Sequence, residues 1–232
     1  MGFKMKHDIE GELSKWELYK SYGEFNINFE NAISIYRIFF QRLIHLSYDV
    51  IEKEDENEEV IEPAGDRLFF ILLDNLGAME IVSKCKAAFI DFFSNQKKSF
   101  GSYTYEFNEE NYCLHPKEYD FALLLFKKSE EMVVLRNVLI HSNYFVEFWP
   151  MDDTYGKTLQ GYKSYKTSKG FESRKFKYDI KFFQKVNANV FNIETFLHKF
   201  YFYLISNEEN DFRFEEEYNI LKRMDFTIPQ VK

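Results

Sequence analysis

The hydrophobic positions of the chain predict long α-helices. Apolar side chains recur every three or four residues over positions 25–52, which is the period of one helix face, and Asn28 or Asn31 can cap this helix. Residues 1–24 are then expected to be a polar N-terminal segment. A run of acidic residues follows the helix and predicts a solvated loop.

Two further segments repeat the helical period. The second predicted helix spans residues 67–93, with Asp66 as its cap and Gly77 tolerated in its interior, and we expect it to pack antiparallel to the first. The third begins at Pro116, a residue that favours the first turn of a helix, and continues to His141. Its predicted apolar face consists of Phe121, Leu124, Leu125, Met132, Leu135 and Leu139.

After the third helix the pattern changes to one typical of strands. The β-prone residues 144–150 are expected to pair with the alternating residues 171–180 as a β-hairpin. A last long helix is predicted over residues 180–205, and residues 207–232 are expected to be a polar tail with a short helical turn. The fold class predicted is mainly α: an antiparallel helical bundle in one domain, with a β-hairpin inserted before the last long helix.

Composition narrows the classes of protein that the chain can belong to. Its 45% hydrophobic residues allow a substantial core. No apolar run reaches the roughly 18–20 residues that span a bilayer, and the N-terminal sequence lacks the apolar core of a signal peptide, so we expect a cytoplasmic protein with no membrane partner. Cys85 and Cys113 form no CxxC pair and are expected to be reduced thiols. Cys113 and His115 lack a second pair of ligands nearby, so no metal or other cofactor is expected.

Three polar residues interrupt the apolar pattern near the end of the third helix: Arg136, Asn137 and His141, in the sequence RNVLIH. Residues four apart share a helix face and residues seven apart nearly do, so Glu130, Asn137 and His141 form one stripe. Arg136 reaches the same volume only through its long side chain, the end of the helix or a second protomer. An Arg-Asn pair with a His at this spacing is expected roughly 0.03 times by chance in such a chain.

This sequence resembles the R-x4-6-H motif of the HEPN superfamily, whose members are helical bundles. The resemblance implies a homodimer in which two motifs face one cleft, and a metal-independent endoribonuclease with Arg136, Asn137 and His141 as catalytic residues. The hairpin after the motif helix is similar to one inserted in some HEPN proteins. HEPN toxins that pair with nucleotidyltransferase antitoxins carry R-x4-H-x-Y, whereas Tyr144, a supporting residue here, stands at H-x-x-Y.

The side chains of the motif suit metal-free cleavage of RNA. A histidine transfers protons near neutral pH, so His141 would activate the ribose 2′-hydroxyl. A planar, always protonated guanidinium can stabilise the charge that develops on the phosphate, which is the role expected of Arg136. Asn137 would hold the imidazole or a phosphate oxygen. Glu130 either positions Arg136 or His141 or is an exposed helical glutamate.

Charge is distributed unevenly along the chain. The net charge of −8 is not that of a general nucleic-acid binder, yet residues 157–181 hold eight Lys or Arg and two acids. This segment is either a solvated hairpin or a basic arm that binds RNA phosphates while Tyr162, Tyr165 or Phe171 stacks on unpaired bases. The RNA-binding candidates are Lys163, Lys166, Lys169, Arg174 and Lys175.

Hypotheses from different functional classes follow from these patterns. The first is a homodimeric HEPN-type endoribonuclease in defence or toxin-like growth control, with an antitoxin or defence-system partner protein. The second is a HEPN-like RNA-binding or protein-interaction module that cuts nothing. A third is an unrelated helical interaction protein with a chance match to the motif.

Overall fold

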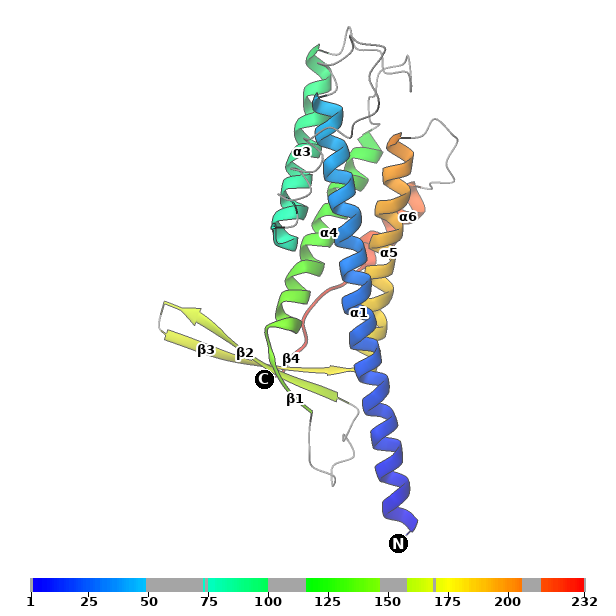
Figure 1. Ribbon diagram of the computed structural model, residues 1–232, viewed down its shortest axis with the longest axis vertical. Coiled ribbons are helices and arrows are strands. Elements are labelled where there is room, and N and C mark those ends of the chain that lie inside the picture. Colours follow the sequence, from blue (N-terminus) through cyan, green and yellow to red (C-terminus); the bar gives the residue numbers. More distant parts are fainter. Residues whose placement is uncertain are drawn as a thin grey trace, which may run out of the picture. The chain divides into compact units, whose positions relative to one another are not determined.

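The computed structural model describes residues 2–48, 73, 75–99, 116–146, 158–168, 170–205 and 214–231. The described chain is mainly helical, as predicted. It divides into two compact units, which are presented separately: residues 1–30, 131–192 and 224–232 form the first, and residues 31–130 and 193–223 the second. The elements in chain order are α1 (Gly2–Tyr48), α3 (Ala78–Ser99), α4 (Pro116–Ile140), β1 (Asn143–Val146), β2 (Thr158–Thr167), β3 (Gly170–Asp179), α5 (Ile180–Ile205), α6 (Phe214–Arg223) and β4 (Gln230–Val231) (Figure 1).

The second unit is a helical bundle around an aromatic core. Phe39 of α1 lies 6.4 Å, ring centre to ring centre, from Phe89 of α3 and from Phe126 of α4, and 6.1 Å from Phe200 of α5. All four rings are buried. Large aromatic side chains bury much apolar surface each, so their convergence on one centre accounts for the packing of these helices.

The direction of α3 differs from the prediction. Tyr36 of α1 interacts electrostatically with the Cys85 thiol of α3, and Phe39, one turn further along α1, contacts Phe89, one turn further along α3. Later residues of α1 contact later residues of α3, so the two helices run parallel. The predicted antiparallel pair was therefore wrong. α4 runs in the opposite direction to both (Figure 1).

The start of α3 also differs from the prediction. The Gly77 carbonyl accepts the Ile81 N–H at 3.0 Å, and the Glu80 carboxylate accepts the Gly77 N–H at 3.1 Å. Gly77 is therefore the N-cap of α3, with Glu80 reaching back as in a capping box, and not an interior residue as predicted. The helix begins at Ala78, while the predicted cap Asp66 lies outside the described residues.

In the first unit, α1 begins much earlier than predicted. The helix starts at Gly2, so the expected polar segment of residues 1–24 is helical and both predicted asparagine caps lie inside the helix. Leu18, Ser21 and Phe25 are buried at helical spacing and continue the apolar stripe towards the N-terminus. The prediction failed because exposed polar residues outnumber these few buried positions.

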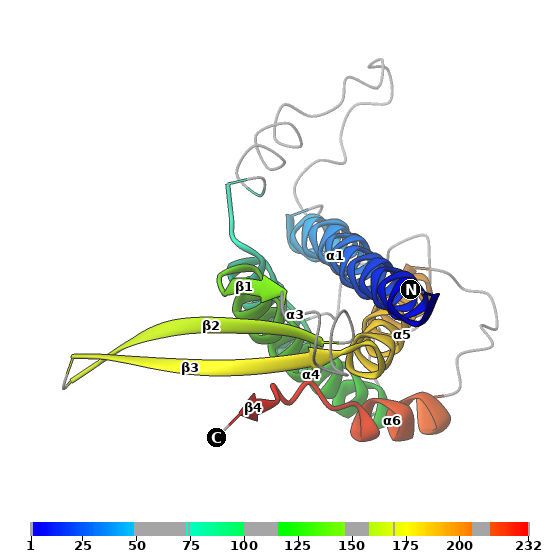
Figure 2. The same cartoon turned by 90° about the horizontal axis from the view of Figure 1, so that it is seen from below.

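The strands form a four-stranded antiparallel sheet in the order β1-β2-β3-β4. β3, which covers most of the predicted strand 171–180, pairs with β2, and β1 pairs with the other edge of β2. The described part of the predicted partner strand, residues 144–146, therefore does not pair with β3 as predicted. Two residues separate the paired Thr167 and Gly170, and Gly170 has a φ of 122°, a conformation that glycine adopts without a steric cost. Figure 2 shows β2 and β3 side by side along their length.

The C-terminal residues are folded, which the prediction of a polar tail with one short helical turn missed. α6 is a ten-residue helix with Leu221 buried, and β4 joins the edge of β3. In the first unit, Asp225 accepts a hydrogen bond from the Lys185 ammonium of α5 at 2.7 Å and one from the Thr227 N–H at 2.8 Å. These donors, Lys185 first, hold the pKa of Asp225 well below its usual range.

Candidate functional site

The candidate site lies at the C-terminal end of α4 in the first unit. Leu135 and Leu139 are fully buried and fix this end of the helix, while Arg136 and Asn137 between them are half-buried. α4 ends one residue before His141, which is exposed in the following turn and donates its backbone N–H to the Asn137 carbonyl at 3.2 Å. The motif therefore presents an exposed histidine at the end of the helix and, one turn earlier, a half-buried arginine.

The guanidinium of Arg136 is held by contacts with α1. Its Nη2 lies 3.3 Å from a carboxylate oxygen of Glu30, and its carbon lies 5.2 Å from the centre of the Phe29 ring. Nη1 donates to the Asn137 side-chain oxygen at 3.5 Å, a long hydrogen bond. Nε is buried, and no acceptor among the described residues lies within hydrogen-bonding distance of it. The guanidinium is thus positioned, yet its donors are poorly satisfied.

Lys163 connects the basic hairpin to the motif. Its ammonium, from β2, donates to the Asn137 carbonyl at 3.0 Å, the same oxygen that accepts the His141 N–H. Carbonyls at a helix C-terminus carry partial negative charge, so a cation is favourable there. Partial burial lowers the pKa of Lys163. Lys163 thus links β2 to the end of α4.

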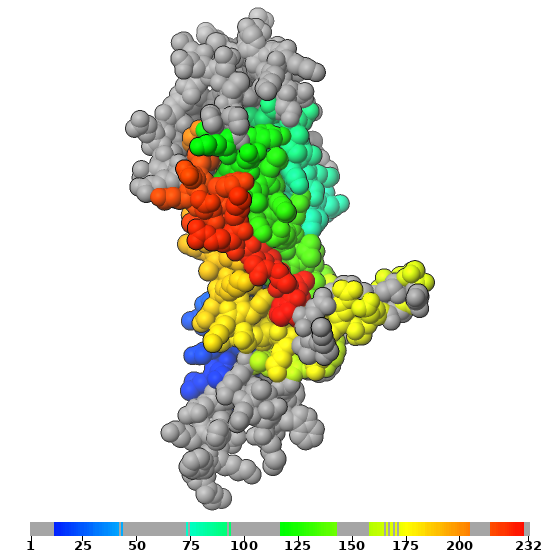
Figure 3. All heavy atoms as spheres, turned by 180° about the vertical axis from the view of Figure 1, so that it is seen from behind, coloured from blue at the N-terminus to red at the C-terminus, as the bar shows by residue number. Residues whose placement is uncertain are grey.

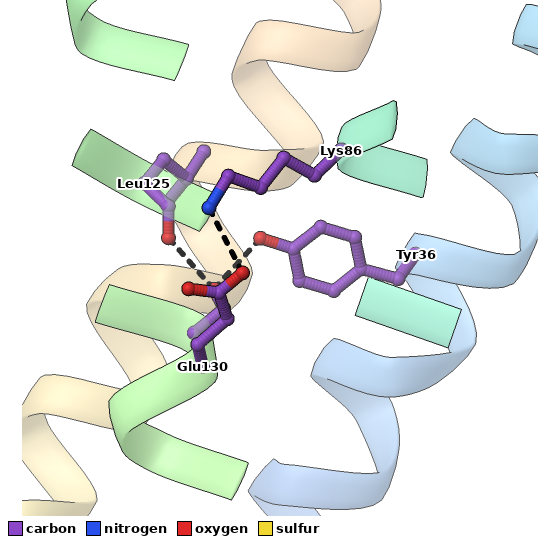
Figure 4. A network of polar contacts seen from close by, with 5 residues as sticks. Tyr36, Lys86, Leu125 and Glu130 are labelled. Atoms are coloured by element: carbon purple, nitrogen blue, oxygen red, sulfur yellow. Dashed lines mark hydrogen bonds and ion pairs between the residues drawn. The ribbon is translucent and has the colours of Figure 1, made fainter. Parts of the chain in front are cut away.

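Glu130 belongs to the second unit and has a partner there. Its carboxylate accepts a hydrogen bond from the Lys86 ammonium at 3.0 Å (Figure 4). Next to it in sequence, the buried Ser129 hydroxyl accepts the Tyr36 hydroxyl at 2.7 Å and donates to the Leu125 carbonyl at 2.9 Å. Burial raises the pKa of Tyr36 well above its usual value, so this hydroxyl stays a donor. A contact between bundle helices thus accounts for Glu130, and its role towards Arg136 or His141 stays a prediction.

The remaining predicted site residues lie in the sheet. Tyr144 stands opposite Gly161 in the register of β1 and β2. Lys166 is exposed, and the Arg174 guanidinium pairs with the Glu172 carboxylate at 2.9 Å. The Lys175 ammonium lies 5.7 Å from the centre of the Tyr162 ring. Lys169 lies outside the described residues.

The described residues also bear on metal ligation and membrane insertion. No group of three or more His, Cys, Asp or Glu among them is placed to hold a metal ion. Cys85 is a buried free thiol whose pKa is raised by burial, and Cys113 and His115 lie outside the described residues. No helix in the described part of the chain is long and apolar enough to cross a membrane.

Sequence reasoning missed Phe29 and Glu30, the two residues that hold Arg136. Glu30 is 106 residues from Arg136, and a Phe-Glu pair inside a helix carries no signal of its own. Only the folded chain brings them to the motif.

Comparisons with known proteins do not assign the chain to a family. The functional assignment therefore rests on the geometry of the α4 end and on the chemistry of its side chains. No family model matches the chain, and neither a curated protein nor a solved structure matches it.

Proposed function

We propose that the protein is a metal-independent endoribonuclease of the HEPN type, which cleaves RNA by attack of the ribose 2′-hydroxyl. One observation carries this proposal: the end of α4 combines an exposed His141, Arg136, whose Nε has no acceptor among the described residues, and Lys163 from the basic hairpin. Together these groups supply a proton acceptor, a group that binds the phosphate and a positively charged approach for RNA.

His141 takes the proton of the 2′-hydroxyl in this mechanism. The 2′-oxygen then bonds to phosphorus, the bond from phosphorus to the 5′-oxygen of the next nucleotide breaks, and that oxygen takes a proton from water or an imidazolium. The products are a 2′,3′-cyclic phosphate and a 5′-hydroxyl. Exposure of the His141 side chain lets an RNA strand approach the imidazole.

Arg136 binds the phosphate oxygens on which charge develops. To do so it exchanges the Glu30 carboxylate for a phosphate, and the side chain of Glu30 is 56% exposed. A partly exposed ion pair of this kind is worth about 0–1 kcal/mol, less than a charge-assisted, bidentate bond from arginine to phosphate. The exchange is therefore favourable once RNA is bound.

The HEPN resemblance extends the proposal to assembly and biological setting. Two protomers would place their motifs in one cleft, which gives Arg136 of one copy access to the His141 region of the other. Defence or toxin-like growth control is the setting that the resemblance implies, with an antitoxin or defence-system protein as partner in the cytoplasm.

Cleavage of a labelled single-stranded RNA in EDTA tests the proposal. We expect cut products with 2′,3′-cyclic phosphate ends, lost in His141→Ala and kept in His198→Ala, which removes another exposed histidine on α5. Strict dependence on added Mg²⁺ or Mn²⁺, or equal cleavage by the two variants, would remove this mechanism.

A second function is favoured by the contacts of Arg136 with Glu30 and Phe29, which fix this side chain within its own chain. In that case the protein is an RNA-binding module that cuts nothing. Wild-type protein that binds single-stranded RNA and leaves it intact, with and without divalent metal, would establish this function instead.

A further inference from the structure

The β2–β3 hairpin has two chemically different faces. Side chains alternate along a strand, and Leu159, Phe176 and Tyr178 point to the face that is buried. Lys163 and Arg174 lie on this same inner face, further towards the turn. Figure 3 shows β2 and β3, yellow-green to yellow, projecting from the rest of the first unit. The outer face carries Tyr162, Ser164 and Lys166 from β2, and Ser173 and Lys175 from β3.

The outer face offers an aromatic ring among cations and hydroxyl groups. Tyr162 is 37% exposed and pairs across the strands with Lys175, whose ammonium lies over its ring. The acidic residues of the hairpin are engaged elsewhere: Glu172 lies on the inner face with Arg174, and Asp179 at the base accepts the Phe182 N–H. This combination is the one that binds single-stranded nucleic acid, where bases stack on rings and phosphates meet cations.

The register places the backbone of Tyr162 close to that of the motif. Tyr162 pairs with Asn143 of β1, and Asn143 follows His141 by two residues. From the rise along a strand and the spacing between strands, the backbones of Tyr162 and His141 are on the order of 8 Å apart. A base stacked on the Tyr162 ring would therefore belong to a nucleotide near the bond that His141 would cleave.

We infer that Tyr162 is the stacking platform for an unpaired base beside the scissile phosphate, with Lys175 and Lys166 binding the flanking phosphates. The inference rests on the proposed function and narrows its substrate to single-stranded or looped RNA. Stacking of a base on an aromatic ring is stronger than an exposed contact between an ammonium and a ring, so the base displaces Lys175, which then meets a phosphate. Because every base has a flat face, recognition here is tolerant of sequence.

The test measures binding in the His141→Ala background, where no cleavage interferes. The probes are a fluorescein-labelled oligouridine and an abasic oligomer with the same number of phosphates, followed by anisotropy. Tyr162→Leu should weaken binding of the oligouridine about tenfold and leave the abasic oligomer unaffected, whereas Tyr162→Phe should bind both like the parent. Trp16→Ala removes another exposed aromatic side chain, on α1, and should change neither affinity.

Three results would overturn the inference. They are an unchanged oligouridine affinity in Tyr162→Leu, an equal loss for the abasic oligomer, and absence of binding to either probe. Thermal melting shows whether Tyr162→Leu is folded, and Tyr162→Val, with a β-branched side chain suited to a strand, carries the same test if it is not. Failure of the nuclease proposal looks different, because wild-type protein would then bind oligouridine through Tyr162 and leave it uncut in EDTA.

Discussion

Replacing Arg136 with alanine separates a functional arginine from a structural one. We expect Arg136→Ala to lower the free energy of unfolding by only about 1–2 kcal/mol while RNA cleavage falls at least about a hundredfold, the usual consequence of losing a group that stabilises transition-state charge. The stability change is small because the contacts of this side chain are individually weak.

Each contact of Arg136 contributes little to the free energy of unfolding. The pair with Glu30 is partly exposed, which limits it to about 0–1 kcal/mol, and the guanidinium over Phe29 adds about 0.5–1 kcal/mol. The hydrogen bond to Asn137 is long, and the buried Nε has no acceptor among the described residues, so neither adds much. Truncating the buried Phe29 itself, by contrast, should cost about 3–5 kcal/mol.

Urea unfolding measures the stability change, and Glu30→Gln is its matched control. This variant keeps the guanidinium and removes only the ion pair, so the midpoint should shift by less than in Arg136→Ala, at an unchanged m-value. Because Arg136 is then no longer neutralised, Glu30→Gln should retain cleavage and bind RNA at least as tightly as wild type. Added salt should reduce the difference in RNA affinity between Glu30→Gln and wild type.

Two results would refute this reasoning. A loss of more than about 4 kcal/mol in Arg136→Ala, matched by a similar loss in Glu30→Gln, would make the ion pair a structural element of the fold. Full cleavage by folded Arg136→Ala would remove the arginine from the mechanism, whatever its stability.

Three further changes have defined outcomes. His141→Ala, at an exposed position, should melt within about 2 °C of wild type yet lose cleavage, and a clear drop in melting temperature would make His141 structural. Lys166→Glu should reduce the slope of log K against log salt for single-stranded RNA by about 0.7, since one phosphate contact is lost, and an unchanged slope would mean that Lys166 contacts no RNA. The pKa of Asp225 is held low mainly by Lys185, so its carboxylate stabilises the fold above the unfolded-state pKa of about 4, and this stabilisation is lost as pH falls below that value. Asp225→Asn should therefore be less stable than wild type at pH 7 and approach it in acid, and a difference independent of pH in urea unfolding would contradict this linkage.

Elements fixed by a local pattern were the ones that the sequence predicted well. The helix expected over residues 180–205 is α5, Ile180–Ile205, and the helix expected to open at Pro116 is α4. Both carry a continuous apolar stripe, and a proline favours the first turn of a helix, so neither depends on distant residues.

Elements whose partners are distant in sequence were predicted poorly. Strand pairing depends on register, which a local pattern does not give. The turn before Gly170 joins β3 to β2, whereas the prediction paired this strand with residues 144–150. The short polar turn that ends at Gly170, between two alternating segments, is the sequence signal for this hairpin. The parallel course of α3 was missed as well, because a helical period does not give the direction in which one helix packs against another.

The candidate site shows the same division. Arg136, Asn137 and His141 stand within six residues at the end of one helix, so their spacing could be recognised from sequence. Phe29 and Glu30 come from α1 and meet Arg136 only in the folded chain. The motif was therefore predictable, whereas the contacts that decide how tightly its arginine is held were not.

The hairpin cations cannot all serve RNA in the same way, because the fold has already given some of them partners. Lys163 donates to the Asn137 carbonyl at the end of α4, and Arg174 pairs with Glu172. Lys166 and Lys175 lie on the outer face, where Lys175 pairs with Tyr162 and Lys166 stands nearer the turn. A variant that reverses the charge of Lys163 thus disturbs the helix end together with any RNA contact, and a loss of cleavage would not identify its cause. Outer-face substitutions avoid this ambiguity, so they should change the salt dependence of RNA binding, whereas substitutions at Lys163 should first lower stability.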